Sequence, residues 1–261
     1  MIDMDNNFRE KIRRELEEQQ GHVGMYYKDL VTDEEFSYNG DEQFFAASVI
    51  KLPVFMCISK WADLGQADMH EKVKVHESDK VPICGALTLF DGEPEVTVAT
   101  LCRLMISISD NTATNILINH FGIEKFQQAF REIGLKGTVL NRLLFDSEAG
   151  ARGLENKIVP VEIAMLLSEI YHRSFVNCKV SEEINDVLLL QQINHKICGK
   201  LDSVPVEVAH KTGEDEGLTN DAGIVYAPKP FIVCYASHDT DVYRFEDFIR
   251  RTTYDICMEH M

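Results

Sequence analysis

The chain has 261 residues, of which 45% are hydrophobic and 26% are charged, a composition typical of a globular protein with a large core. Its formal net charge of −17 excludes the basic surface of a nucleic-acid-binding or anionic-membrane-binding protein, so we expect neither partner. The long apolar run over residues 44–58 contains a lysine and a proline and is too short to span a bilayer.

The cysteines and histidines indicate the compartment of the protein and whether it binds a metal. Seven scattered cysteines without a Cys-x-x-Cys spacing indicate free thiols of a reducing compartment rather than a disulfide framework. Residues 1–6 lack the basic and apolar segments of a signal peptide, so the sequence as written predicts a cytoplasmic protein. A secreted or periplasmic protein whose leader has been removed is the alternative. No metal-ligand spacing of the nine histidines and no glycine-rich phosphate loop occurs, so we expect no metal and no cofactor.

The first elements in chain order are a helix and two strands. Apolar residues at helical spacing predict a helix over residues 6–20 that ends at Gly21. Strands are predicted over 22–29 and 35–38, joined by a polar turn. From Ser48 the pattern becomes helical, with turn-rich residues over 67–95, Thr97 as an expected N-cap and a long surface loop over 138–158. The predicted helices cover residues 48–64, 97–108, 112–121, 123–133, 160–172 and 181–190.

Strands return near the C-terminus. They are predicted over residues 204–210, 218–226 and 231–237, followed by a closing helix over 241–259. The pattern predicts an α/β (α+β) fold, in which an antiparallel sheet with flanking helices is built from both chain termini, residues 1–47 and 200–261. Residues 48–199 form an inserted all-helical lobe. We expect the functional site in the cleft between the two parts.

A candidate nucleophile stands at the start of the helical part. Ser48 and Lys51 lie three residues apart among apolar side chains, so on a helix that begins near Ser48 they share one face and can touch. Desolvation would lower the pKa of Lys51 and leave a neutral amine to activate the serine. Taken alone, an exposed lysine one turn after an N-cap serine is the alternative interpretation.

Two further motifs favour the catalytic interpretation of Ser48 and Lys51. In chain order the chain carries Ser48-x-x-Lys51, Ser109-Asp110-Asn111 and Lys211-Thr212-Gly213. Together they resemble the motif set of class A β-lactamases and penicillin-binding proteins. Residues 44–48, 104–115, 208–213 and 219–225 also look like class A sequence, so the likeness spans residues 20–260. The resemblance implies a β-lactamase/transpeptidase-like fold and a monomeric serine hydrolase that forms an acyl-enzyme and hydrolyses the amide bond of a small-molecule β-lactam.

The resemblance also implies roles for the first two motifs. Ser48 would attack the carbonyl, Lys51 would accept its proton, and Ser109 would pass a proton to the departing nitrogen. Asn111 would orient the substrate and hold Lys51. Asp110 is expected to be structural and to tie the loop.

The last motif is expected to bind substrate. Lys211 and Thr212, at a strand end, would bind an acidic group, and Gly213 would permit close approach to the backbone. The backbone N–H groups of Ser48 and Glu214 would form the oxyanion hole. His210 is expected to be a packed strand residue rather than a base.

The segment before the helix at Pro160 departs from the class A pattern. Class A enzymes carry there a glutamate that activates the deacylating water, whereas residues 142–148 place leucine in that position. Asp146 and Glu148 are candidates to hold the water, and solvent-facing loop acids are the alternative. Glu155 and Asn156 are expected to close the loop by pairing with Arg142.

Four functions therefore stay open. The first is a class A-type β-lactamase with slow deacylation. The second is a penicillin-binding-protein-like D-alanyl-D-alanine peptidase, favoured by the missing glutamate. A cytosolic serine amidase or esterase on the same fold is the third. A non-catalytic binding module is the fourth, and the intact motifs argue against it. The acidic residues 214–216, with no arginine near Thr219, would weaken capture of a carboxylate-bearing β-lactam.

Overall fold

The computed structural model describes residues 6–81 and 83–261. Residues 1–5, which carry most of the expectation about a signal peptide, and Pro82 of the turn-rich segment lie outside the described residues. The helices are α1 (Asn6–Glu17), α2 (Lys51–Asp63), α3 (Val98–Ser107), α4 (Asn111–Phe121), α5 (Ile123–Glu132), α6 (Ser147–Ala151), α7 (Pro160–Tyr171), α8 (Cys178–Leu188) and α9 (Val242–Glu259), with 3₁₀ helices η1 (Ala47–Ile50), η2 (Glu77–Asp79) and η3 (Leu87–Leu89). The strands are β1 (His22–Asp29), β2 (Glu35–Tyr38), β3 (Phe44–Phe45), β4 (Lys72–Lys74), β5 (Glu95–Thr97), β6 (Lys157–Ile158), β7 (Glu207–Asp215), β8 (Leu218–Tyr226) and β9 (Phe231–His238).

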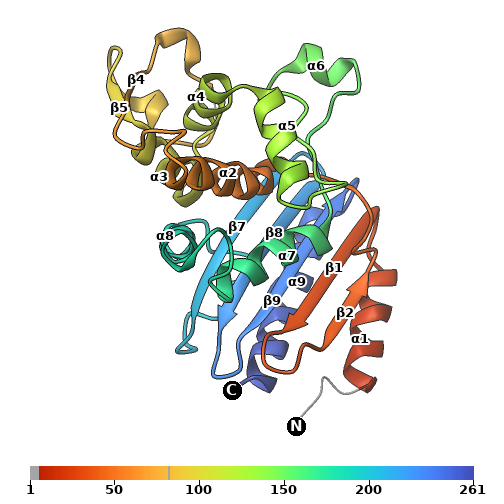
Figure 1. Cartoon of the computed structure of the whole chain (residues 1–261). Coiled ribbons are helices and arrows are strands. Elements are labelled where there is room, and N and C mark those ends of the chain that lie inside the picture. The colour runs from red at the N-terminus through yellow and green to blue at the C-terminus, as the bar shows by residue number, and fades with distance from the viewer. Residues whose placement is uncertain (1–5, 82) are drawn as a thin grey trace.

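The main sheet combines the two ends of the chain, as predicted. Its strand order is β2-β1-β9-β8-β7, and every neighbouring pair is antiparallel (Figure 1). The N-terminal strand β1 pairs with the C-terminal strand β9, with Met25 opposite Tyr235. The predicted antiparallel sheet built from both termini is therefore confirmed, and β7 is an edge strand.

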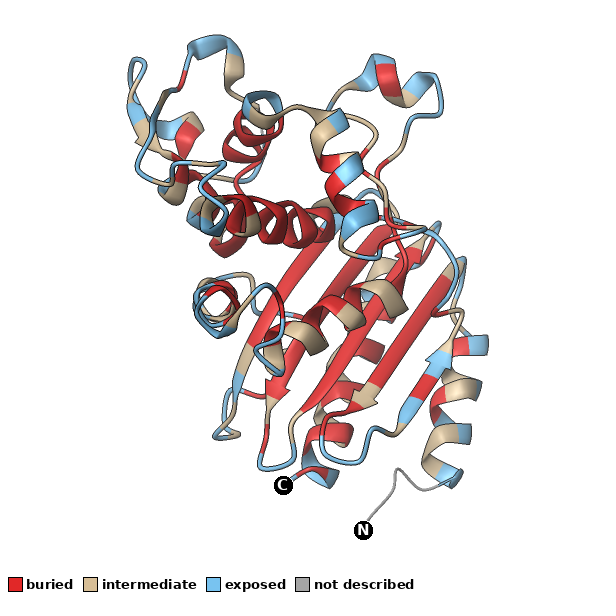
Figure 2. Ribbon diagram, viewed as in Figure 1, coloured by how far each residue is buried: buried red, intermediate tan, exposed pale blue. Residues whose placement is uncertain are grey.

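Both faces of this sheet are covered. Alternate residues of β1 and β9 point to opposite sides: Met25 and Tyr235 belong to the core under α1 and α9, whereas Tyr26 and Cys234 belong to the larger core under the other helices. Strands β1, β8 and β9 are accordingly buried along almost their whole length (Figure 2). Burial on both faces explains why residues 231–236 of β9 form a continuous apolar run.

Helices that lie in the sequence between the N-terminal and the C-terminal strands form a second layer, and α2 is at its centre. Helix α2 is buried at nearly every position, including Lys51, and so lies inside the core rather than on its surface. Helix α7 packs against β1, β8 and β9, and α8 packs against β7 (Figure 1). The division of the chain into a 1–47/200–261 lobe and a 48–199 lobe stays a prediction, since α7 lies on the sheet although it comes from the middle of the chain.

One predicted helix cap is confirmed, and two predicted boundaries are wrong. Thr97 caps α3, because its side-chain oxygen accepts the backbone N–H of Thr100. Pro53 falls in the first turn of α2, where its missing N–H is tolerated. Ser48, however, lies in the 3₁₀ helix η1 rather than at the start of an α-helix. The strand predicted over 204–210 in fact runs to Asp215, because β8 pairs with it along its whole length.

Two segments predicted as irregular contain short elements. The loop over 138–158 includes α6 and β6, and β6 pairs with β3 just before Ser48. The turn-rich residues 67–95 contain β4, which pairs with β5. Both pairings join segments far apart in the chain, so no local pattern indicated them.

Candidate active site

A cavity of about 700 Å³ opens where the η1 segment, the end of β7 and the loop around α6 meet. Its walls include seven of the residues expected at the site, namely Ser48, Ser109, Asn111, Asp146, Thr212, Gly213 and Glu214. Lys51 and Lys211 lie immediately behind this wall and are fully buried. The three motifs, which are widely separated in the chain, therefore meet at one cavity.

The Lys51 amine is held by the Ser-Asp-Asn loop. Its Nζ donates to the Ser109 backbone oxygen at 2.8 Å, to Ser109 Oγ at 3.0 Å and to Asn111 Oδ1 at 2.7 Å. Burial, and then the positive charge of Lys211, hold the pKa of Lys51 well below its usual value. Among the described residues Ser48 is not a hydrogen-bond partner of this amine, although free enzymes often show long catalytic contacts.

Ser109 bridges two lysines. Lys211 Nζ donates to Ser109 Oγ at 3.1 Å, the same oxygen that Lys51 contacts, and also to the Thr212 backbone oxygen at 2.8 Å. Burial lowers the pKa of Lys211 to about 7, against the attraction of Asp221. The Ser109 hydroxyl thus contacts two amines, and burial lowers the pKa of each.

The Ser-Asp-Asn loop is a strained turn fixed by its aspartate. Ser109 adopts a φ of 56°, a left-handed conformation that non-glycine residues rarely adopt. Asp110 is completely buried, and its carboxylate accepts the N–H groups of Ala86, Leu87 and Ala113, so it caps α4 and ties down the 83–90 segment. Its expected structural role agrees with these contacts.

The β7 edge comes very close to the Ser48 segment. A Cβ atom added at Gly213 would lie 3.1 Å from both the Ala46 oxygen and the Ser48 nitrogen. Glycine therefore lets β7 approach the Ser48 backbone, in addition to the approach of substrate that the sequence indicated. Ala47, directly before Ser48, has a φ of 40°, which marks a second strained position at the site.

His210 is packed beneath the Lys-Thr-Gly strand, as expected. Its Nδ1 lies 3.0 Å from Asp221 Oδ1, and its Nε2 lies 3.0 Å from Asn194 Oδ1. Both His210 and Asp221 are buried, and neither lines the cavity. This buried pair joins the neighbouring strands β7 and β8 behind the cavity wall.

The loop over 138–158 is closed at its base. Arg142 Nη2 lies 2.7 Å from Glu155 Oε2. Asn156 accepts the N–H groups of Asn141 and Arg142 through Oδ1, at 2.7 and 3.0 Å, and donates through Nδ2 to the Arg142 oxygen at 3.0 Å. The predicted pairing of Glu155 and Asn156 with Arg142 is confirmed.

Comparisons with known proteins agree with this geometry. The model of the Beta-lactamase enzyme family matches residues 7–258. This chain belongs to the beta-lactamase enzyme family. The chain is 27% identical over 233 residues to Beta-lactamase ROB-1 of Haemophilus influenzae, covering 85% of this chain and 74% of that protein. The predicted membership of the class A β-lactamase and penicillin-binding-protein superfamily is confirmed, and the protein is a serine β-lactamase-like hydrolase.

Solved structures of the family have the same fold. A beta-lactamase from Sphaerobacter thermophilus superposes with a TM-score of 0.89 at 24% identity, covering 99% of this chain and 98% of that one. PBP-A superposes with a TM-score of 0.88 at 25% identity, covering 97% of this chain and 96% of that one. A mutant of PBP-A has been solved as an acyl-enzyme complex with penicillin G.

The structure shows which leucine of the 142–148 segment faces the site of this β-lactamase-family chain. Leu144 lines the cavity, and Leu143 does not. The side chain of Asn115 holds the backbone of Leu144 from both sides, accepting its N–H at 2.8 Å and donating to its oxygen at 2.9 Å. An apolar side chain is thus held firmly where class A enzymes are expected to place their deacylating glutamate.

The two candidate replacement acids lie in different places. Asp146 lines the cavity, but its Oδ1 accepts the Ala149 N–H at 2.9 Å and caps α6. Glu148 is exposed on α6 and does not line the cavity. Neither placement tests a role with water, so both roles stay predictions.

Three residues near the site carried no assigned role from sequence. They are Asn115, which holds Leu144; Asn220, whose Nδ2 donates to the Phe45 oxygen at 2.8 Å; and Lys196, which is completely buried behind Gly213. Asn115 lies four residues after Asn111 on α4, a helical spacing that could have indicated it. No local signal marked Lys196 or Asn220, because their partners are distant in sequence.

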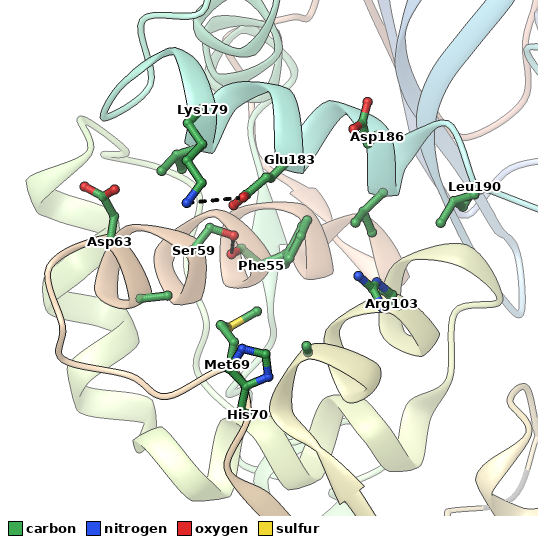
Figure 3. A pocket seen from close by; sticks show the side chains of 14 residues that line it. Phe55, Ser59, Asp63, Met69, His70, Arg103, Lys179, Glu183, Asp186 and Leu190 are labelled. Carbon is green, nitrogen blue, oxygen red and sulfur yellow. Dashed lines mark hydrogen bonds and ion pairs between the residues drawn. The ribbon is translucent and has the colours of Figure 1, made fainter.

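A second cavity, of about 750 Å³, lies between α2, α3 and α8 (Figure 3). Phe55, Met69 and Val187 line it, with Lys179 and Glu183 pairing at its edge. None of the predicted site residues lines this cavity, so the candidate active site is chosen by its residues and not by cavity size. Over residues 6–81 and 83–261, no cluster of side chains could hold a metal ion and no helix is long and apolar enough to cross a membrane.

Proposed function

We propose that this chain hydrolyses the amide bond of β-lactams through an acyl-enzyme at Ser48 that it clears slowly. The observation that carries the proposal is the position of Lys51. A buried amine with a lowered pKa, held by Ser109 and Asn111 one turn from Ser48, is a base made ready for a serine nucleophile.

These contacts support the following steps for acylation of Ser48. The Ser48 hydroxyl gives its proton to Lys51 as its oxygen bonds to the lactam carbonyl carbon. The N–H groups of Ser48 and Glu214 hold the oxyanion. When the carbon–nitrogen bond breaks, the nitrogen takes a proton from Ser109 Oγ, which is protonated again by Lys51 or Lys211. Substrate is held by Asn111, Lys211 and Thr212.

Deacylation is the step that we expect to be slow. It needs a base to activate water beside the ester, and Leu144 offers no such group. We propose Asp146, which lies on this wall of the cavity, as a partial substitute for the missing base. One of its carboxylate oxygens already accepts the Ala149 N–H as the N-cap of α6. We therefore expect an acyl-enzyme that persists for longer than one catalytic turnover of an efficient hydrolase.

A D-alanyl-D-alanine peptidase is the second candidate. The apolar Leu144 wall and the similarity to PBP-A favour it, because a peptidase acylated by a β-lactam stays acylated. The two functions share Ser48 and differ in substrate, so turnover of an N-acylated D-alanyl-D-alanine peptide separates them. A serine amidase or esterase is a third outcome of the same comparison.

Intact-mass measurement after incubation with penicillin G tests the proposal. Wild-type protein should gain the mass of one penicillin, and Ser48→Ala should gain none. Ser147→Ala, an exposed serine of the same cavity, is the matched control and should behave as wild type. Absence of an adduct and of turnover in the wild type would exclude both the β-lactamase and the peptidase.

We infer that the active unit is a monomer acting on small molecules, since every predicted site residue comes from one chain. Light scattering should give a mass close to 29.7 kDa. The seven cysteines are all free, which is consistent with the expected reducing compartment; the compartment itself stays a prediction.

A further inference from the structure

Lys196 is a fully buried lysine to which the mechanism above assigns no role. Its Nζ donates to the Gly213 oxygen at 2.9 Å and to the Asn220 oxygen at 3.1 Å, and it lies 3.1 Å from Glu214 Oε1. Three oxygen partners around one amine satisfy all of its donors. A buried lysine costs free energy, so its presence behind the active-site strand requires an explanation.

The Gly213 oxygen belongs to the same peptide unit as the Glu214 N–H. That unit is planar and trans, since no cis peptide bond occurs in the described residues, and so its C=O and N–H point in opposite directions. With the oxygen directed at Lys196, the N–H is directed away from the lysine. Glu214 lines the cavity that Ser48 also lines, and this N–H is our proposed oxyanion donor.

Lys196 also acts on the other side of the oxyanion hole. It holds the backbone of Asn220, whose side-chain Nδ2 donates to the Phe45 and Ala46 oxygens at 2.8 and 3.3 Å. Phe45 and Ala46 lead directly into the Ser48 segment. One amine thus connects both backbone segments that we expect to hold the oxyanion.

The segment that carries Lys196 is itself anchored. The Ile197 N–H donates to Asp221 Oδ2 at 3.1 Å, Asn194 Oδ1 contacts His210, and Arg250 Nη1 donates to the His195 oxygen at 3.2 Å. Anchors on both sides of the lysine leave its side chain little freedom. The position of the amine is therefore determined by the fold rather than by a mobile loop.

We propose that Lys196 is a positioning residue of the oxyanion hole, which orients and polarises the Gly213–Glu214 peptide so that its N–H stabilises the oxyanion at Ser48. The inference rests on the proposed acyl-enzyme function. A cation bound to a peptide oxygen strengthens the N–H of that peptide as a donor, because hydrogen-bonded groups polarise one another. Loss of the cation should therefore reduce the stabilisation of the transition state more than that of the bound substrate.

The test compares three variants with the wild type. Lys196→Met keeps the length of the side chain and removes the donor, Lys196→Arg keeps a cationic donor, and Lys200→Met changes an exposed lysine nearby as the control. Acylation by nitrocefin is measured in single turnovers, which separate the acylation rate constant from the dissociation constant of the substrate and do not depend on slow deacylation. Because removing an oxyanion-hole donor outright costs about 10²–10³ in rate, we expect Lys196→Met to acylate at least about tenfold more slowly with little change in the dissociation constant.

A spectroscopic readout separates this role from general support of the fold. Hydrogen bonds in the oxyanion hole lower the stretching frequency of the acyl-enzyme ester carbonyl, which infrared difference spectra of the penicillin G adduct report. The band should move to higher frequency in Lys196→Met and stay in place in Lys200→Met and Lys196→Arg. If Lys196→Met does not fold, as thermal melting would show, Lys196→Arg carries the test, and a slow, high-frequency adduct in that folded variant overturns the proposal.

The outcomes distinguish the two proposals. A wild type that forms no adduct refutes the acyl-enzyme function. A wild type that acylates, together with a folded Lys196→Met of equal rate and carbonyl frequency, overturns only the role of Lys196. A slower Lys196→Met whose carbonyl band does not move also overturns it, because the lysine would then support folding alone.

Discussion

Two buried lysines at this site share one serine hydroxyl. Ser109 Oγ lies 3.0 Å from Lys51 Nζ and 3.1 Å from Lys211 Nζ, and burial lowers the pKa of both amines. Their proposed tasks require opposite states, however. Lys51 must be neutral to accept the Ser48 proton, whereas Lys211 must be charged to bind an acidic group.

The pH profile of acylation should report these opposite requirements. Lys211 carries its charge below its pKa of about 7 and loses it above, so kcat/KM for penicillin G should fall on the alkaline side of pH 7. Protonation of Lys51 should cause the fall on the acidic side. In Lys211→Arg the alkaline fall should disappear, because arginine stays charged. An unchanged alkaline limb in that variant, with Lys200→Arg as control, would contradict the assignment.

Leu144 is the residue that we expect to limit turnover. Asn115 holds its backbone in place, so a glutamate introduced there would begin from a fixed position beside the ester. Since general-base catalysis contributes about 10²–10⁴ in rate, Leu144→Glu should clear the penicillin G adduct at least about tenfold faster. The lifetime of the adduct by mass measures this. Leu154→Glu, in an exposed part of the same loop, should leave the lifetime unchanged.

At the scale of elements, the loop over 138–158 is an ordered wall of the site. Asn156 is buried at its base and makes three hydrogen bonds to the backbone of Asn141 and Arg142. A side chain that satisfies three backbone groups substitutes for secondary structure in this segment. The wall that carries Leu144 and Asp146 therefore depends on a residue outside the chemistry.

Asn156→Ala should loosen this wall. It leaves two backbone N–H groups and one oxygen without their partner, and each loss of a buried partner costs about 1–3 kcal/mol before water compensates. We expect a loss of about 2 kcal/mol in unfolding free energy and faster proteolysis within residues 138–158. Asn119→Ala, an exposed change on α4, should alter neither. Equal stability of both variants to urea would refute the role of Asn156.

At the scale of the whole molecule, the sheet separates a supporting core from the core beneath the site. Leu16 of α1 and Phe248 of α9 belong to the core on one face of the sheet. The residues around Ser48 and Lys51 belong to the core on the other face. Rigid strands between the two layers hold the site in place. We therefore expect changes in α1 to alter stability without altering catalysis, whereas α9 also anchors the Lys196 segment through Arg250.

Leu16→Ala tests this separation. The side chain is 1% exposed, and truncating a buried leucine typically costs about 2–5 kcal/mol, so the melting temperature should fall clearly. The acylation rate per folded molecule at 25 °C should stay within about twofold of wild type, because α1 lies across the sheet from Ser48. Leu64→Ala, which is 55% exposed, should change neither quantity. A large loss of acylation in folded Leu16→Ala would show that the two layers are coupled.

Short-range patterns in the sequence were sufficient for several parts of this protein. The strands β1 and β2 and the cap at Thr97 depend on neighbouring residues, so periodicity and turn residues predicted them. The roles that we propose for Ser48 and Lys51 also rest on their residue types and spacing. Boundaries were predicted less well: Ser48 lies in a 3₁₀ turn, and β7 continues through Lys211, because tertiary pairing overrides local preference.

The sequence by itself determined which residue types we propose for the reaction, since a nucleophile, an amine and a hydroxyl in known motifs limit the chemistry. Only the tertiary structure decided how they meet. It placed Ser109 between two lysines, selected Leu144 rather than Leu143 as the wall, and directed Lys196 at the Gly213 oxygen. These contacts join residues far apart in the chain, and their geometry depends on the packed sheet and helices, which no local spacing contains.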